Sequence, residues 1–394
     1  MTDSLYIAWR YVRYHKFKTA ILVASITLIL FLPAGLDVLV KQSALQLRDR
    51  ATSTPLLVGA KGSELDLVLN TLYFESTPPS AMPMSETSRV RETEFALSIP
   101  MYVRFRAKGH PIVGTGLEYF DFRGMRLREG RLFTLLGECV LGSRVADVLQ
   151  LSEGDSLMSS SENVFDIAGV YPLKMHVVGV LQPTGTPDDL AVFVDVRTTW
   201  VIQGLGHGHQ DLSQPDAGSV VLKKDGNRVT ANAAVLNYNE ITPENASSFH
   251  FHGSTQDFPI TAVLAVPHDE KARALLMGRY QSDDDPAQIV RPSMVMDELL
   301  ATVLRVRTFV MAGASLLAIA TLLTIVLVFM LSLRLRKPEL MTMAKLGCSR
   351  LRISGIVGCE ILLVIAVSML LASGLTIATR QFATTAIRWF LLQG

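Results

Sequence analysis

Two closely spaced pairs of histidines are the residues whose spacing most suggests chemistry. His207 and His209 stand in LGHGHQD, and His250 and His252 stand in FHFHG. Residues two apart on an extended strand point to the same face, so four converging imidazoles could hold a tetrahedral or square metal ion. The alternative is that the first pair lies in a solvated loop and the second pair is polar surface. The metal site is therefore a hypothesis with a plain structural alternative.

The sequence lacks the motifs by which a chain hydrolyses ATP or a peptide bond. The nearest approach to a phosphate-binding loop is GAKGS at residues 59–63, which does not have the GxxxxGK(S/T) spacing. Neither G-x-S-x-G nor HExxH occurs. Cys139, Cys348 and Cys359 lie far apart and predict neither a disulfide framework nor a zinc knuckle. We therefore expect no enzymatic activity and no cofactor bound directly to this chain.

Composition indicates that the chain carrying these residues is a membrane protein. The 394 residues are 49% hydrophobic and 19% charged, and the mean hydropathy is positive, which is too apolar for an ordinary soluble protein. With 37 basic and 36 acidic residues, the net charge is +1. No excess of positive charge favours nucleic-acid binding.

Three apolar runs are long enough to cross a hydrocarbon core of about 30 Å. They predict transmembrane helices at residues 19–40, 309–333 and 353–379. A cleavable signal peptide is the alternative for the first run, but the run is longer than an h-region and no small-residue cleavage site follows.

Cations flank the predicted spans unevenly and so predict their orientation. Residues 1–18 and the loop 334–352 are rich in Lys and Arg, and Glu339 is the only acid in that loop. Both segments are expected in the cytoplasm, and residues 41–308 outside. Cations on the outer flanks, such as Arg48 and Arg305, make this bias moderate. The expected location is the bacterial inner membrane, with several passes and a cytoplasmic N-terminus.

Two carboxylates fall within or beside the predicted spans, where charge is costly. Glu360 lies near the cytoplasmic start of the third run, so we expect it to pair with Arg352 or with a partner subunit. A proton or ion site is the alternative. Asp37 is expected at the outer interface.

The C-terminal residues 380–394 are too short to cross again and carry Arg380 and Arg388. They predict an amphipathic helix at the outer interface, with Trp389 at headgroup level. The alternative is an extension of the third span.

The segment between the first two spans predicts an α+β domain with helical stalks. Strand-like runs occupy residues 96–106, 165–181, 190–196, 219–222 and 260–266, and helical patterns occupy 64–72, 143–149, 198–203, 269–280 and 293–307. Residues 41–50 and 293–309 contain no Pro or Gly, so the adjoining spans are expected to continue into them as stalks. The alternative is that linkers break the helices there.

Two motifs and this layout carry a family resemblance. Residues 334–360 read RLRKPELMTMAKLGCSRLRISGIVGCE, and residues 137–155 read GECVLGSRVADVLQLSEGD. Together with one span, a large outer domain and the remaining spans, they resemble the MacB, LolC and FtsX permeases, also called mechanotransmission or type VII ABC permeases. The family's short cytoplasmic helix docks on the ATPase. The resemblance therefore assigns coupling to Glu339, Leu340, Met341, Met343, Ala344, Lys345, Leu346 and Gly347.

The resemblance implies a permease subunit that passes the motion of a separate ATPase to the outer domain, to export or extrude a lipoprotein, peptide or lipophilic substrate. ATP and magnesium would be bound by that partner, present in two copies. The chain would pair with itself or with a paralogous permease, contact lipid, and work with a periplasmic adaptor or substrate protein. Most of the family has four spans, whereas this sequence predicts three. The alternatives are a membrane-anchored regulator or scaffold of a partner such as a cell-wall enzyme and, on the histidine pairs, a metal-handling component.

Overall fold

The computed structural model describes residues 2–75, 77–160, 172–208, 221–225, 228–231, 239–242, 245–246 and 249–391. The chain divides into two compact units. The helical unit comprises Met1–Asp49 and Asp297–Gly394, and the α+β unit comprises Arg50–Met296. The second unit is thus inserted between two parts of the first.

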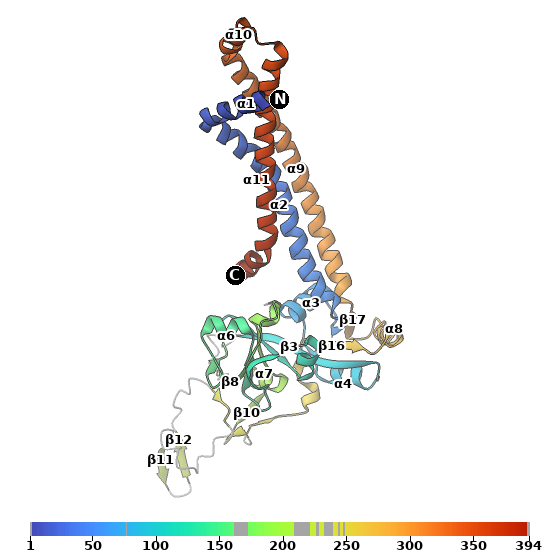
Figure 1. Cartoon of the computed structure of the whole chain (residues 1–394). Helices are drawn as coiled ribbons and strands as arrows, with labels where there is room; N and C mark the ends of the chain where they lie inside the picture. The colour runs from blue at the N-terminus through green and yellow to red at the C-terminus, as the bar shows by residue number, and fades with distance from the viewer. Residues whose placement is uncertain are drawn as a thin grey trace. The chain divides into compact units, whose positions relative to one another are not determined.

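The helical unit is built from long helices that contain the apolar runs of the sequence, together with the short helices α1 and α10 (Figure 1). Its members are α1 (Thr2–Tyr14), α2 (Lys16–Thr52), α9 (Pro292–Leu335), α10 (Lys337–Lys345) and α11 (Arg350–Leu391). Among the described residues, α2, α9 and α11 each contain a stretch long and apolar enough to cross a membrane. These stretches coincide with the three predicted runs.

The three long helices meet through aliphatic and hydroxyl side chains. Leu22 of α2, Ile325 of α9 and Val364 of α11 form a buried cluster. Beside it, the Thr27 hydroxyl donates to the carbonyl of Ser368 at 3.4 Å, and the Ser368 hydroxyl lies 3.4 Å from the carbonyl of Val23. Hydroxyl bonds of this kind join helices where apolar packing alone gives little preference over lipid.

Both predicted stalks are continuous helices. Helix α2 runs without interruption to Thr52, and α9 begins at Pro292. Arg48 on α2 faces Asp297 on α9, with a 3.0 Å contact from Nε to Oδ1 and 3.3 Å from Nη2 to Oδ2. The pair connects the two stalks close to where the chain leaves the helical unit.

The α+β unit is organised around one mixed sheet with the strand order β13-β8-β6-β9-β4-β3-β16-β1-β17, and β5 and β7 also pair with β8. Strand β16 lies between β3 and β1, antiparallel to both. The strands of this sheet are β1 (Leu56–Ala60), β3 (Ala96–Ala107), β4 (His110–Thr115), β5 (Leu127–Gly130), β6 (Glu138–Leu141), β7 (Ser156–Met158), β8 (Leu173–Leu181), β9 (Val192–Asp195), β13 (Asn239–Glu240), β16 (Ala262–Pro267) and β17 (Ala287–Val290).

Three further strand pairs form two-stranded sheets: β2 (Met82–Pro83) with β15 (Pro259–Ile260), β10 (Gly206–Gly208) with β14 (Phe249–Phe251), and β11 (Val221–Asp225) with β12 (Arg228–Ala231). The helices are α3 (Glu64–Tyr73), α4 (Ser85–Arg91), α5 (Glu118–Arg123), α6 (Ser143–Leu149), α7 (Val196–Ile202) and α8 (Glu270–Arg279). Ser63 and Asp269 cap α3 and α8 through side-chain oxygens that accept backbone N–H groups. Helices α3, α6, α7 and α8 lie where helical patterns were predicted, at 64–72, 143–149, 198–203 and 269–280, so these predictions are confirmed, whereas α4 and α5 were not predicted.

Helix α11 continues past Thr379 to Leu391 without a break, so residues 380–391 extend the third apolar helix, as the alternative proposed. Residues 165–171 and 219–220, which belong to two predicted strands, and the last three residues of the chain lie outside the described residues.

Candidate functional site

The segment predicted to be a coupling helix forms helix α10, which is followed by a hydrogen-bonded glycine turn. The N–H of Gly347 donates to Ala344 at 3.1 Å and the N–H of Cys348 donates to Met343 at 3.1 Å. This is the Schellman pattern, which requires a residue of positive φ after the cap. Gly347 supplies it with φ +92°. The turn reverses the chain so that α11 can begin at Arg350.

Helix α10 carries apolar side chains that nothing in the described chain covers. It has no buried residue, and Met341 and Leu346 are 52% and 83% exposed. Glu339 lies in its first turn and Lys345 in its last, as the helix dipole favours. A short helix that exposes large apolar groups between two apolar helices is typical of a protein–protein interaction surface.

At the base of α10, Arg336 and Glu360 form a buried ion pair. The Arg336 Nη1 donates to Glu360 Oε2 at 2.7 Å, and the two residues are 9% and 6% exposed. Lys18 Nζ lies 3.8 Å from the other carboxylate oxygen. The guanidinium carbon of Arg336 lies 3.5 Å from the ring centroid of Tyr11, which adds a cation–π contact.

This group, hereafter the Glu360 cluster, joins four helices. Tyr11 belongs to α1, Lys18 to α2 and Glu360 to α11. Arg336 is the N-cap residue of α10. The cluster therefore connects the start of α10 to three other helices. The expectation that Glu360 forms a structural ion pair is confirmed, but its partner is Arg336 and not Arg352, which is exposed.

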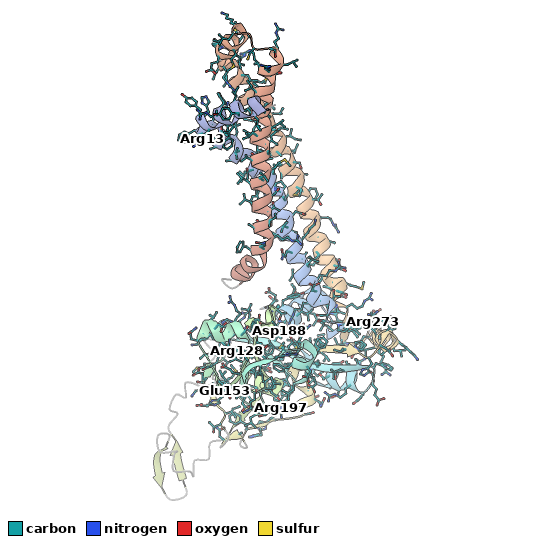
Figure 2. The ribbon with its side chains drawn as sticks, viewed as in Figure 1. Arg13, Arg128, Glu153, Asp188, Arg197 and Arg273 are labelled. Atoms are coloured by element: carbon teal, nitrogen blue, oxygen red, sulfur yellow. The ribbon has the colours of Figure 1, made fainter. Side chains whose placement is uncertain are left out.

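A second buried ion pair fixes the last turn of α2 within the α+β unit. Arg50 is 7% exposed and Asp188 2%. Arg50 donates from Nη1 to Asp188 Oδ2 at 2.6 Å and from Nη2 to Oδ1 at 2.9 Å. Its Nε donates to the Leu72 carbonyl, and the Tyr119 hydroxyl donates to Asp188 at 2.8 Å. Figure 2 labels Asp188 within this unit.

The electrostatics of this second pair favour its charged form. Burial alone would raise the pKa of Asp188, but the charge and hydrogen bonds of Arg50 outweigh burial and hold that pKa below its usual range. Burial, together with the negative charge of Asp188, raises the pKa of Tyr119 to about 12. Tyr119 therefore remains a hydrogen-bond donor to the carboxylate at neutral pH.

The histidines of the metal hypothesis are partly brought together. Strands β10 and β14 pair so that His207 is the backbone partner of His250, and the rings of His250 and His252 lie 4.8 Å apart. His209 lies outside the described residues. Within the described part of the chain, no group of three His, Cys, Asp or Glu side chains is placed to hold a metal ion.

Sequence reasoning identified α10 and Glu360 but not the residues that fix them. Arg336 is one of several basic residues in its loop, and Arg50 is one of several on the outer flank of the first span. The available signal was an arginine at the end of a long apolar helix, although each also has an acid nearby in the sequence, Asp49 beside Arg50 and Glu339 after Arg336. Helix α1 was also not predicted, although its aromatic and basic residues recur at intervals of three and four, as on a helix.

Comparison with known proteins identifies the class. The family model for the MacB-like periplasmic core domain matches residues 19–238. The chain therefore belongs to this family, the MacB/FtsX class of ABC transporter permeases.

Two solved structures share low identity with the chain. The periplasmic region of MacB from Actinobacillus actinomycetemcomitans has 12% identity and a TM-score of 0.36, covering 63% of this chain and 93% of that one. The extracellular domain of the noncanonic ABC-type transporter YknZ from Gram-positive bacteria has 11% identity and a TM-score of 0.32, covering 60% and 98%. A comparison with curated proteins finds no match.

Proposed function

We propose that α10 docks on a separate ATPase and that the motion of this ATPase reaches the α+β unit through the Glu360 cluster and α2. The observation that carries the proposal is the coupling of α10, with its exposed apolar surface, to three other helices through Arg336 and Glu360. A helix that only closed a loop would not need a buried ion pair at its base, because such a pair carries a large desolvation cost.

Helix lengths support a cytoplasmic position for α10 and a cytoplasmic N-terminus. At 1.5 Å per residue, Glu360 and Phe382 are about 33 Å apart along α11, close to the thickness of a hydrocarbon core. With Phe382 at the outer boundary, the Glu360 cluster lies at the inner one, and α10 projects beyond it. Residues 334–352 then supply the basic side chains expected on the cytoplasmic side.

In this proposal the motion of the ATPase acts on the α+β unit, outside the membrane. Helix α2 continues from Lys16 to Thr52, and its last turn is held in the α+β unit by Arg50 and Asp188. A continuous helix transmits a tilt or shift over its whole length, whereas a linker would absorb it. Two copies of the chain with two ATPases, which bind ATP and magnesium, would export or extrude a lipoprotein, peptide or lipophilic substrate.

Co-purification from native membranes tests the proposal. We expect the tagged wild-type chain to recover an ABC ATPase, and Leu346→Asp or Met341→Asp to lose it. Leu275→Asp on α8 changes an exposed leucine of the α+β unit and should retain the ATPase. If the wild type recovers no ATPase in mild detergent, the chain is better described as an anchored regulator of a periplasmic partner.

A metal-handling role has one observation in its favour, the register of His207 against His250. Directly opposed residues of an antiparallel pair have Cβ atoms about 5 Å apart, which suits two ligands of one ion. Changing all four histidines to Ala would abolish zinc binding by the purified chain if this role is real. It would leave ATPase recovery unaffected.

A further inference from the structure

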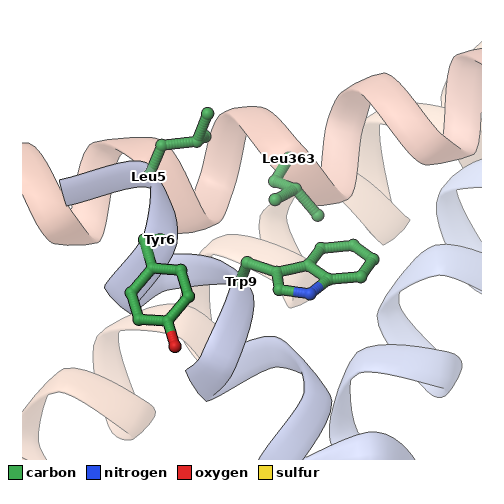
Figure 3. Close-up of a pocket in the computed structure, with 4 residues that line it drawn as sticks. All are labelled: Leu5, Tyr6, Trp9 and Leu363. Atoms are coloured by element: carbon green, nitrogen blue, oxygen red, sulfur yellow. The ribbon is translucent and has the colours of Figure 1, made fainter. Parts of the chain in front are cut away.

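A shallow apolar cavity lies between α1 and α11. It has a volume of about 360 Å³ and is lined by Leu5, Tyr6 and Trp9 of α1 and by Leu363 of α11. Figure 3 shows the indole of Trp9 beside Leu363, with Leu5 and Tyr6 on the preceding turn of α1. The three α1 side chains remain 50–64% exposed. The cavity is therefore open to whatever surrounds the helices.

The opposite side of α1 packs against the other helices of this unit, which sets the direction in which the α1 side chains that line the cavity face. Ala8 is fully buried, and Tyr11 lies against the guanidinium of Arg336. Leu5 and Trp9 are four residues apart and share a face of the helix. The aromatic face thus cannot turn inward to bury itself without breaking the contact at Tyr11.

Cations border this aromatic face. Arg10, Arg13 and Lys16 are exposed, and Figure 2 labels Arg13 near the turn into α2. Between Asp3 and Asp37 the chain contains no acidic residue. An occupant of the cavity therefore meets apolar surface at Trp9 and positive charge one turn away.

We propose that the cavity holds an acyl chain of an anionic phospholipid, whose headgroup binds Arg10 and Arg13. Leu363 belongs to the apolar stretch of α11, so the cavity opens where hydrocarbon is available. Aromatic side chains followed by Arg and Lys are the pattern of helices that lie at a membrane surface. The complementary charge selects an anionic headgroup over a zwitterionic one.

A second copy of the chain fits this surface less well. A two-fold contact through α1 would bring Arg10 and Arg13 of both copies together, and like charges across an interface oppose association. A lipid satisfies the apolar and the charged requirement at once. The inference depends on membrane insertion but not on coupling to an ATPase, so the two proposals can fail separately.

Quenching of Trp9 fluorescence by brominated lipids tests the proposal in the full-length chain. The chain is reconstituted into vesicles with a minor fraction of phosphatidylglycerol brominated in its acyl chains and phosphatidylcholine as the remainder, and also with the bromine on phosphatidylcholine instead. Subtracting the signal of Trp9→Phe isolates Trp9 from Trp200 and Trp389. Thermal unfolding confirms that each variant is folded.

We expect brominated phosphatidylglycerol to quench Trp9 well beyond its mole fraction. Arg10→Gln with Arg13→Gln should remove this preference, at about five-fold in lipid association per arginine. Arg128→Gln with Arg273→Gln removes the same charge from the α+β unit and should leave the preference intact. If both brominated lipids quench Trp9 in proportion to their mole fractions, the cavity makes only ordinary lipid contact. If neither lipid quenches Trp9, protein covers the cavity. Either result overturns the proposal.

Discussion

The guanidinium of Arg50 and the carboxylate of Asp188 face each other through two hydrogen bonds of 2.6 and 2.9 Å, although 138 positions separate them in the sequence. Arg50 is in the last turn of α2 and Asp188 lies in the short 3-10 helix Pro187–Leu190. Because both are buried, neither charge can be satisfied by water if the other is removed. The attachment of α2 to the α+β unit therefore depends on both residues.

Removing one charge of this pair should destabilise the α+β unit. We expect Arg50→Gln or Asp188→Asn to lower its free energy of unfolding by about 3–5 kcal/mol, because an unpaired charge is left buried. The double variant should cost less than the sum of the single ones. Denaturant unfolding followed by Trp200 fluorescence measures this. Arg128→Gln, at a more exposed ion pair, should change stability by less than about 0.5 kcal/mol.

The Glu360 cluster should be needed for transmission more than for docking. We expect Glu360→Gln to retain the ATPase in co-purification but to reduce the response of its ATP hydrolysis rate to the permease, since α10 would move without α11. Arg352→Gln, at an exposed position near the same end of α11, serves as the control. A normal response in Glu360→Gln vesicles would show that motion takes another route.

The glycine turn after α10 should tolerate no side chain. Gly347 has φ +92°, a conformation that costs an L-residue about 1 kcal/mol or more. Gly347→Ala should therefore distort the turn and weaken ATPase recovery. Gly358→Ala is the matched control, because it lies within α11 and an added Cβ meets nothing within 4 Å. Equal recovery in the two variants would show that the turn geometry is not needed for docking.

Acid should weaken the strand that begins at Glu138. Burial opposes its ionisation, but Arg131 and the N–H groups of Thr134 and Leu135 outweigh burial and lower the pKa of Glu138 from 4.5 to about 2. A carboxyl with a depressed folded-state pKa stabilises the fold fully above its unfolded pKa. This stabilisation is lost as the pH falls from about 4.5 toward 2.

Thermal unfolding should therefore separate the wild type from Glu138→Gln near neutral pH and bring their melting temperatures together near pH 2. A gap that stays constant over this range would mean that Glu138 acts through its shape and not through its charge. Arg131→Gln should reproduce the effect, because Arg131 supplies the opposite charge.

The native cysteines report the orientation of the chain. Cys348 lies in the turn after α10 and is partly exposed, whereas Cys139 is buried. With Cys359→Ser in the background, a membrane-impermeant maleimide should label Cys348 only in inside-out vesicles. Glu153→Cys, at an exposed position of the α+β unit, should be labelled only from the other side. Labelling of both positions from one side would contradict the proposed topology.

The helices could be predicted from the sequence because each depends on local properties. The three apolar runs, the stalk without Pro or Gly at 293–309 and the glycine after α10 are all readable within one segment. The ion pairs could not be predicted, since they depend on how helices rotate about one another. Arg352 is nearer to Glu360 in the sequence than Arg336, yet packing places Arg336 against the carboxylate.

The register of the sheet was equally out of reach. Nothing in FHFHG or LGHGHQD indicates that His207 and His250 are opposite each other, because these two strands are far apart in the chain and their pairing depends on how the domain folds between them. The cavity at Trp9 could not be predicted either, because it depends on α1. This helix is too short and too charged to cross a membrane and so leaves no apolar run in the sequence.

The position of β16 bears on how the protein is made. Strand β1 emerges early, yet both of its neighbours, β16 and β17, come from residues 262–267 and 287–290. About 200 residues must therefore be synthesised before β1 can pair, and pairings this distant in sequence form slowly. Until then the nascent chain presents an apolar, unpaired strand. Its maturation should accordingly depend on folding factors more strongly than that of a domain whose neighbouring strands follow one another.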